Sequence, residues 1–235
     1  MDADKHYFIN NPVFVKYKKR FDIAQFKAVT HLKTVFVNER IVEIPFALES
    51  LNGLSRDKRV LDLGCTESVL PLYVAGLGYK VTGFDFRHYP YIHPNLEFVR
   101  GDILQLPFAD ESFDVVFAIS TIEHMGIGFY DDPVLVREAD QRAVAEAHRV
   151  LKKEGTMTIT VPFGVAAMND HQRIYDEAAL GTLLAKFTVR EKRYFRNVTD
   201  VRRQGNFWQQ TDFGEAATIR SQRTTNGVCL VRAAK

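Results

Sequence analysis

Between residues 59 and 161, short apolar runs alternate with stretches of helical periodicity, and this alternation restricts the possible folds more than any other feature of the chain. The apolar runs are expected strands, at 59–63, 80–84, 96–99, 113–119 and 156–161. A long helix is expected over 134–151, between the last two of them. Helical connections of this kind join parallel strands, so the pattern predicts a doubly wound, Rossmann-like α/β sheet.

The last third of the chain departs from this alternation. A helix is expected near 177–185, and it is followed by apolar runs at 187–195 and 227–231 with no convincing helix between them. Two strands joined without a helix are typical of antiparallel neighbours. We therefore expect the sheet to end in an antiparallel C-terminal pair of strands.

The N-terminal part has a mostly helical pattern, including an amphipathic run over 40–51 that is expected to be interrupted near Pro45. We expect a single domain in three parts. These are an N-terminal helical cap (1–56), a Rossmann-like core (57–163) and a C-terminal part (164–235) that completes the sheet and one side of a ligand site.

The charges of the chain are nearly balanced, with 31 Lys and Arg against 29 Asp and Glu and a formal net charge of +2. Proteins that bind nucleic acids usually carry an excess of positive charge on one face, so this balance argues against a nucleic-acid partner. Basic residues do gather at 16–20 and at 190–196, and we expect both groups on solvated faces.

The two cysteines, Cys65 and Cys229, form no CxxC pair, which argues against a disulfide scaffold or a zinc site and favours a reducing compartment. Residues 1–10 are polar and charged, unlike a signal peptide, and no run approaches the ~18 apolar residues of a membrane span. We therefore expect a cytoplasmic protein without a membrane span.

Candidate ligand-binding residues directly follow the first three expected strands. Gly64 follows the first, Asp85 the second, and Asp102 with Ile103 the third. In an open α/β sheet, ligands bind at the carboxyl ends of the strands. A glycine lets backbone approach a ligand, a carboxylate can accept both hydroxyls of a ribose, and an apolar side chain can cover a flat ring. The three strand ends together predict a nucleoside pocket.

A series of motifs over about residues 58–163 resembles the class I S-adenosylmethionine-dependent methyltransferases. They are VLDLG (60–64), VTGFD (81–85), Gly101-Asp102 with LPF (106–108), SFDVV (112–116), and RVL (149–151) with Gly155. The resemblance implies a seven-stranded sheet, mostly parallel with an antiparallel C-terminal pair, and S-adenosylmethionine as cofactor with S-adenosylhomocysteine as product. It implies cofactor contacts from Asp62, Gly64, Cys65, Thr66, Asp85, Phe86, Asp102, Ile103 and Ser120.

In one respect the chain departs from that family's pattern. The family usually has glycines where Thr66 and Ser68 stand, so that only Gly64 of the GxGxG loop remains. The departure leaves the course of the cofactor along this loop open. The absence of GxGxxG also argues against a nicotinamide cofactor.

The segment Ser120–Gly126 (STIEHMG) follows the fourth strand, where the family places catalytic groups. His124, with Glu123 beside it, is a candidate general base, because imidazole titrates near neutral pH. The alternative is that both side chains only cap the following loop. Some related enzymes hold a divalent metal with a Glu-His pair and an acid three residues before the Glu. Ser120 stands there instead, so we expect no metal.

A narrower resemblance, to methyltransferases of sugar and surface-glycan pathways, is carried by STIEHMG with 130–132, VPFG (161–164) and QRIYD (172–176). It implies a saccharide, sugar-nucleotide or glycan acceptor. The candidate acceptor-binding residues are His171, Arg173, Tyr175, Tyr130 and Trp208. The alternative for the first three is helix N-terminal packing, and the alternative for Trp208 is closure of the core at the sheet edge.

These observations predict methyl transfer from S-adenosylmethionine to an oxygen or nitrogen of a small polar acceptor. A non-catalytic binding or scaffold protein of the same fold is a second hypothesis, which depends on Thr66 and Ser68. RNA methylation is a third. It is disfavoured because Ser-Thr-Ile-Glu-His (120–124) stands where an Asn/Asp-Pro-Pro-aromatic motif is expected.

Overall fold

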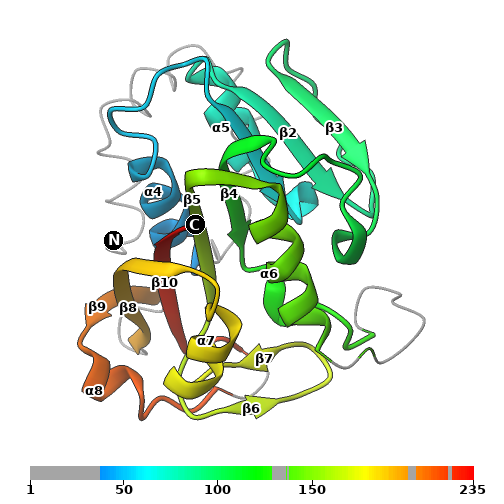
Figure 1. The fold of residues 1–235 in the computed structure, drawn as a ribbon. Coiled ribbons are helices and arrows are strands. Elements are labelled where there is room, and N and C mark those ends of the chain that lie inside the picture. Colours follow the sequence, from blue (N-terminus) through cyan, green and yellow to red (C-terminus); the bar gives the residue numbers. More distant parts are fainter. Residues whose placement is uncertain (1–37, 129–135, 137, 201–204, 222–223) are drawn as a thin grey trace, which may run out of the picture.

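The computed structural model describes residues 38–128, 136, 138–200, 205–221 and 224–235. An eight-stranded sheet runs through the molecule in the order β3-β2-β1-β4-β5-β10-β8-β9 (Figure 1). Its strands are β1 (Arg59–Leu63), β2 (Lys80–Asp85), β3 (Leu96–Arg100), β4 (Phe113–Ile119), β5 (Leu151–Pro162), β8 (Thr188–Asp200), β9 (Gly205–Thr211) and β10 (Gly227–Ala234). The predicted α/β Rossmann-like architecture is confirmed.

Strands β1 to β5 are parallel, while β10 runs antiparallel to both β5 and β8. The prediction of an antiparallel C-terminal pair is thus confirmed, but the predicted number of seven strands is wrong. The eighth strand, β9, pairs antiparallel with β8 over residues that we expected to link the last two strands. Its sequence is polar because β9 is an edge strand with Gln209 and Gln210 exposed, and residue polarity does not reveal pairing of the backbone.

Helices cover both faces of the sheet. The helices are α4 (Arg40–Glu49), α5 (Leu70–Gly76), α6 (Ala139–Val150), α7 (Glu177–Leu183) and α8 (Phe213–Ala216). Alternate residues of β4 contact opposite layers: Val115 and Phe117 pack with α4 and α5, whereas Val116 and Ala118 pack with α6 and α7. Burial on both faces explains why residues 115–119 are all apolar, whereas Asp114 near the start of the strand is only partly buried. Two short strands, β6 (Ala167–Met168) and β7 (Arg173–Ile174), form a separate hairpin.

Some element boundaries differ from those predicted. Helix α4 continues through Pro45, because the buried Phe46 and Ala47 that follow anchor it to the sheet. Helix α6 starts at Ala139, after Glu138 with a φ of 56°. Most of the predicted cap, residues 1–37, lies outside the described residues, as does Tyr130. Within the described part, no helix is long and apolar enough to cross a membrane.

Candidate functional site

A cavity lies at the carboxyl ends of β1, β2 and β4. Its lining comprises Arg40, Gly64, Glu67, Asp85, Phe86, Arg87, Ile103, Ser120, Thr121, His124 and Met125. The structure therefore brings together six of the residues that the sequence singled out, namely Gly64, Asp85, Phe86, Ile103, Ser120 and His124. They come from four separate strand ends and meet because parallel strands end at the same edge of the sheet.

Gly64 ends β1 in a left-handed conformation, with a φ of 72°. A Cβ at this position would overlap the methyl and hydroxyl groups of Thr121, which follows β4. The Thr121 hydroxyl in turn bonds the Leu63 carbonyl at 3.1 Å. Glycine is thus required here by the turn and by a neighbouring side chain, independently of any ligand.

The loop after Gly64 is a short 3-10 helix, Cys65–Glu67. Its conformation explains why Thr66 and Ser68 can stand where the family usually has glycines. Thr66 lies within this helical turn, and Ser68 has an extended backbone with a φ of −127°. Ser68 Oγ accepts a hydrogen bond from the Leu70 amide at 3.1 Å. Neither position needs the conformational freedom of glycine, so Thr and Ser fit this loop without strain.

Asp85 is 2% exposed and lies between two loops. One carboxylate oxygen accepts from the Thr66 amide at 3.0 Å and the other from the Arg87 amide at 2.9 Å. Oδ1 also accepts from Arg87 Nε at 3.5 Å, whereas Oδ2 keeps a second lone pair that a ligand could use. The half-exposed Phe86 and the buried Ile103 give the same cavity an apolar lining.

Other predicted cofactor residues lie next to the cavity but do not line it. Asp102 is exposed and caps the short helix Ile103–Gln105 by accepting from the Leu104 amide at 2.9 Å. Cys65 is buried, and this burial raises the pKa of its thiol far above the ordinary range. Asp62 is 2% exposed, its Oδ2 has no hydrogen-bond partner in the described part of the chain, and burial raises its pKa to about 8.

His124 and Glu123 are both buried in the short helix Ile122–His124. His124 Nδ1 lies 2.7 Å from the His171 carbonyl, which fixes Nδ1 as the protonated nitrogen. Burial lowers the pKa of His124 to about 4 and raises that of Glu123 well above its usual value. His124 is therefore uncharged near neutral pH, so the 3.7 Å contact between its Nε2 and Glu123 Oε1 is not an ion pair there.

The predicted acceptor residues are dispersed. Tyr175 is 3% exposed and donates its hydroxyl to Asp140 at 2.9 Å, while Arg173 donates to the carbonyls of Glu123 and Met125. The two Arg173 bonds hold the segment that carries His124. His171 contacts the His124 ring, with centroids 5.1 Å apart, but none of the three lines the cavity.

Trp208 is on β9, and β5, β10 and β8 lie between it and β4. At roughly 4.8 Å per strand, this places it about 19 Å from β4. It packs at the sheet edge with Phe46, Val228 and Leu230. The structure therefore does not bring Trp208 to the cavity.

Sequence reasoning missed several residues of the site. Arg40, Glu67, Arg87, Thr121 and Met125 line the cavity, and Glu43 lies behind Arg40 and Ser120. Arg40 and Glu43 are three apart on an expected helix, which suggests a surface ion pair and gives no sign of long-range contact with β4.

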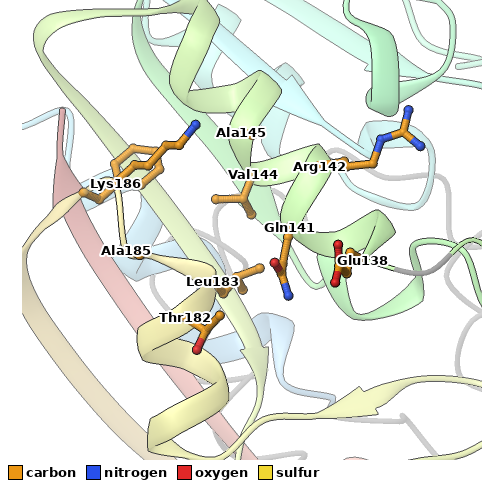
Figure 2. Close-up of a pocket in the computed structure, with 10 residues that line it drawn as sticks. Glu138, Gln141, Arg142, Val144, Ala145, Thr182, Leu183, Ala185 and Lys186 are labelled. Atoms are coloured by element: carbon orange, nitrogen blue, oxygen red, sulfur yellow. The ribbon is translucent and has the colours of Figure 1, made fainter.

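A second hollow lies between α6 and the end of α7 (Figure 2). Its lining includes Gln141, Arg142, Thr182 and Lys186, and it shares no residue with the strand-end cavity. Among the residues described, no group of three or more His, Cys, Asp or Glu is arranged to hold a metal ion.

Parts of this chain are similar in sequence to known methyltransferases. Residues 61–159 match a family model described as a methyltransferase domain. A protein of Encephalitozoon cuniculi, provisionally named a methyltransferase, is 32% identical over 61% of this chain and 65% of its own length. Demethylmenaquinone methyltransferase of Chlorobaculum parvum is 30% identical over 57% of this chain and 54% of its own. The chain thus spans about half to two thirds of the length of these curated relatives.

Solved structures share the fold at low sequence identity. The 1,6-didemethyltoxoflavin-N1-methyltransferase of Burkholderia thailandensis, solved with S-adenosylhomocysteine, has a TM-score of 0.58 and 17% identity, covering 100% of this chain and 90% of that one. The [4+2]-cyclase SpnF has a TM-score of 0.56 at 17% identity, covering 85% and 83%. Residues 61–159 therefore match a methyltransferase-domain model, and the chain shares its α/β Rossmann-like fold with these solved structures.

Proposed function

We propose that this chain, which carries a methyltransferase domain over residues 61–159, transfers the methyl group of S-adenosylmethionine to a small-molecule acceptor. One observation carries the proposal: Gly64, Asp85 and Ile103, from three consecutive parallel strand ends, line one cavity. Because a [4+2]-cyclase shares the fold, the proposal depends on the cavity and the sequence match together.

The residues present fit the cofactor. Asp85 Oδ2 keeps a lone pair for a ribose hydroxyl, and Phe86 with Ile103 would flank the adenine ring. Two buried polar atoms beside the cavity, Asp62 Oδ2 and Thr66 Oγ1, have no hydrogen-bond partner among the residues that the structure describes. Such orphaned groups are costly unless a ligand or water satisfies them, so they favour a polar ligand at this site.

The chain's own contribution to the reaction is positioning. The bound cofactor supplies an electrophilic methyl group, which an acceptor must meet in line. Ser120, His124 and Met125 form the cavity wall at the end of β4 and would orient the acceptor there. The neutral His124 can accept a hydrogen bond at Nε2, but its low pKa makes it a weak base, so its main role would be orientation.

For the acceptor, we propose the type of atom that receives the methyl group and the class of molecule that carries it. We infer an oxygen or nitrogen nucleophile on a small polar molecule, with saccharides supported only by the motif resemblance at 120–126 and 161–176. The relatives' names point elsewhere, to a demethylmenaquinone and to a sterol in Neurospora crassa, the latter at 30% identity over 46% of this chain and 28% of the relative. Both acceptor groups therefore belong in a test.

The competing functions receive less support. The 3-10 turn at Cys65–Glu67 accommodates Thr66 without glycine, which removes the main reason for a non-catalytic reading. The basic group at 190–196 is largely neutralised, with Lys192 paired to Glu177 and Arg196 to Glu215. An RNA substrate would need such cations unpaired to contact phosphates.

The test begins with cofactor binding. We expect S-adenosylhomocysteine, and not NAD, to raise the melting temperature; a ligand at 100 times its dissociation constant stabilises by about 2.7 kcal/mol. Tritiated S-adenosylmethionine with quinone precursors, sterols and sugar nucleotides then identifies the acceptor. Absence of any shift with S-adenosylhomocysteine would contradict the proposal, and label in RNA alone would favour the third hypothesis.

A further inference from the structure

Glu43 is a completely buried carboxylate on α4, and it contacts two residues of the cavity wall. Its Oε1 accepts from Ser120 Oγ at 2.7 Å, and its Oε2 accepts from Arg40 Nη1 at 3.0 Å. A buried carboxylate is costly unless both oxygens are satisfied. Here each oxygen serves a different cavity residue, one from α4 and one from the end of β4.

Ser120 has a left-handed backbone with a φ of 42°, a conformation that costs a non-glycine residue about 1–3 kcal/mol. Two bonds hold it there, since its amide donates to Thr160 Oγ1 at 2.9 Å and its hydroxyl donates to Glu43. Such strain persists only where surrounding groups fix it. Glu43 is one of the two groups that fix this turn.

Arg40 is held in place by acceptors on one nitrogen only. Nη1 donates to Glu43 and to the Ile119 carbonyl at 2.7 Å, and no acceptor within the described part of the chain bonds Nε or Nη2. Burial opposes its charge, but the carboxylates of Glu43, Glu123 and Glu39 outweigh it and raise the pKa of Arg40. A fixed cation with free donors in a cavity wall is suited to a carboxylate ligand.

We infer that Glu43 is a positioning residue of the cofactor site, which orients Arg40 toward the amino-acid carboxylate of the cofactor and holds the Ser120 turn against it. This inference rests on the proposed function. It makes α4, which lies outside the matched domain, part of the cofactor site. The adenosine end, by contrast, would be held by Asp85, Phe86 and Ile103, and within the described part of the chain the hydrogen bonds of the Glu43 carboxylate go to Arg40 and Ser120 instead.

The test compares two ligands in three purified full-length proteins. S-adenosylhomocysteine carries the amino-acid carboxylate, and 5′-methylthioadenosine has the same thioadenosine without it. Glu43→Gln keeps the shape but leaves a single acceptor oxygen for two donors. We expect Glu43→Gln to raise the dissociation constant of S-adenosylhomocysteine by about 10- to 100-fold in calorimetry, which is the range for a lost charged hydrogen bond. The dissociation constant of 5′-methylthioadenosine should rise by less than about 3-fold.

Glu49→Gln is the matched control, because Glu49 lies on the same helix but does not line the cavity. Its carboxylate forms an ion pair with Arg193, with an N–O distance of 2.8 Å. It should leave both affinities within about 2-fold of wild type, as expected for an exposed ion pair. If Glu43→Gln does not fold, Ser120→Ala, which removes only the Oε1 bond, should show the same selective loss at a smaller size.

Equal weakening of both ligands, or unchanged binding of S-adenosylhomocysteine by a folded Glu43→Gln protein, would overturn the inference. In the same way, a folded Ser120→Ala protein that binds S-adenosylhomocysteine like wild type would overturn it where Glu43→Gln gives no folded protein. A wild-type protein that binds neither ligand would instead reject the proposed function, so the two failures are distinguishable.

Discussion

The side chain of Thr121, at the end of β4, fills the space that a Cβ at Gly64 would need at the end of β1. The two residues are 57 positions apart in sequence and become neighbours because β1 and β4 are paired and parallel. This contact fixes the turn in which the cavity begins.

Gly64→Ala should destabilise the fold by about 2–4 kcal/mol, because alanine must adopt a φ of 72° and also displace Thr121. Urea unfolding monitored by circular dichroism measures the change. Gly181→Ala in α7 is the control, since nothing lies within 4 Å of its added methyl group, and it should stabilise by about 0.5–1 kcal/mol. Equal stability of the two variants would contradict this account.

Asp85→Asn should weaken the binding of S-adenosylhomocysteine at least about 10-fold. The asparagine side chain lacks the negative charge and has only one of the two acceptor oxygens that face the Thr66 and Arg87 amides. Isothermal calorimetry measures the dissociation constant. Asp110→Asn is a suitable control, since Asp110 is an exposed partner of Arg149 away from the cavity. Unchanged affinity in Asp85→Asn would separate Asp85 from the cofactor.

His124 should make stability fall in acid. Its folded pKa of about 4 lies below its unfolded value of 6.5, so the unfolded chain binds the proton first as the pH drops through this window. The loss should approach about 3 kcal/mol at pH 4 relative to pH 7. Urea unfolding of wild type and His124→Asn at both pH values tests this; parallel pH profiles would refute the burial argument.

Asp62 should act in the opposite direction. Because burial raises its folded pKa from 3.8 to about 8, the folded state keeps a proton that the unfolded state releases, and its contribution to stability is lost as the pH rises across that window. We expect Asp62→Asn to gain several kcal/mol relative to wild type between pH 4 and 8 in the ligand-free protein. A constant difference between the two proteins at all pH values would count against it.

The single tryptophan offers a test of the site's location. Trp208 is on the far edge strand β9, separated from β4 by three strands, so saturating S-adenosylhomocysteine should leave its emission spectrum unchanged. Fluorescence titration against a calorimetric control for binding is sufficient. A clear shift or quenching on binding would mean that Trp208 reaches the ligand, as one sequence hypothesis held.

The sequence by itself determined the local features: the five parallel strands, the helices in two of their four connections, and the strand-end residues Gly64, Asp85 and Ile103. These are encoded by periodicity and by residues directly next to a strand, so neighbours along the chain suffice to read them. The eighth strand escaped this reasoning, because β9 owes its place to backbone pairing with β8 rather than to an apolar pattern.

Only the tertiary structure decided which polar groups share the cavity. Arg40 and Glu43 look like an ordinary helical ion pair, and Arg173 and Tyr175 look like ligand residues, yet packing brings the first pair to Ser120 and ties the second to Met125 and Asp140. Burial likewise set the protonation of Asp62 and His124. Long-range packing and desolvation depend on the whole fold, and no local window of sequence contains them.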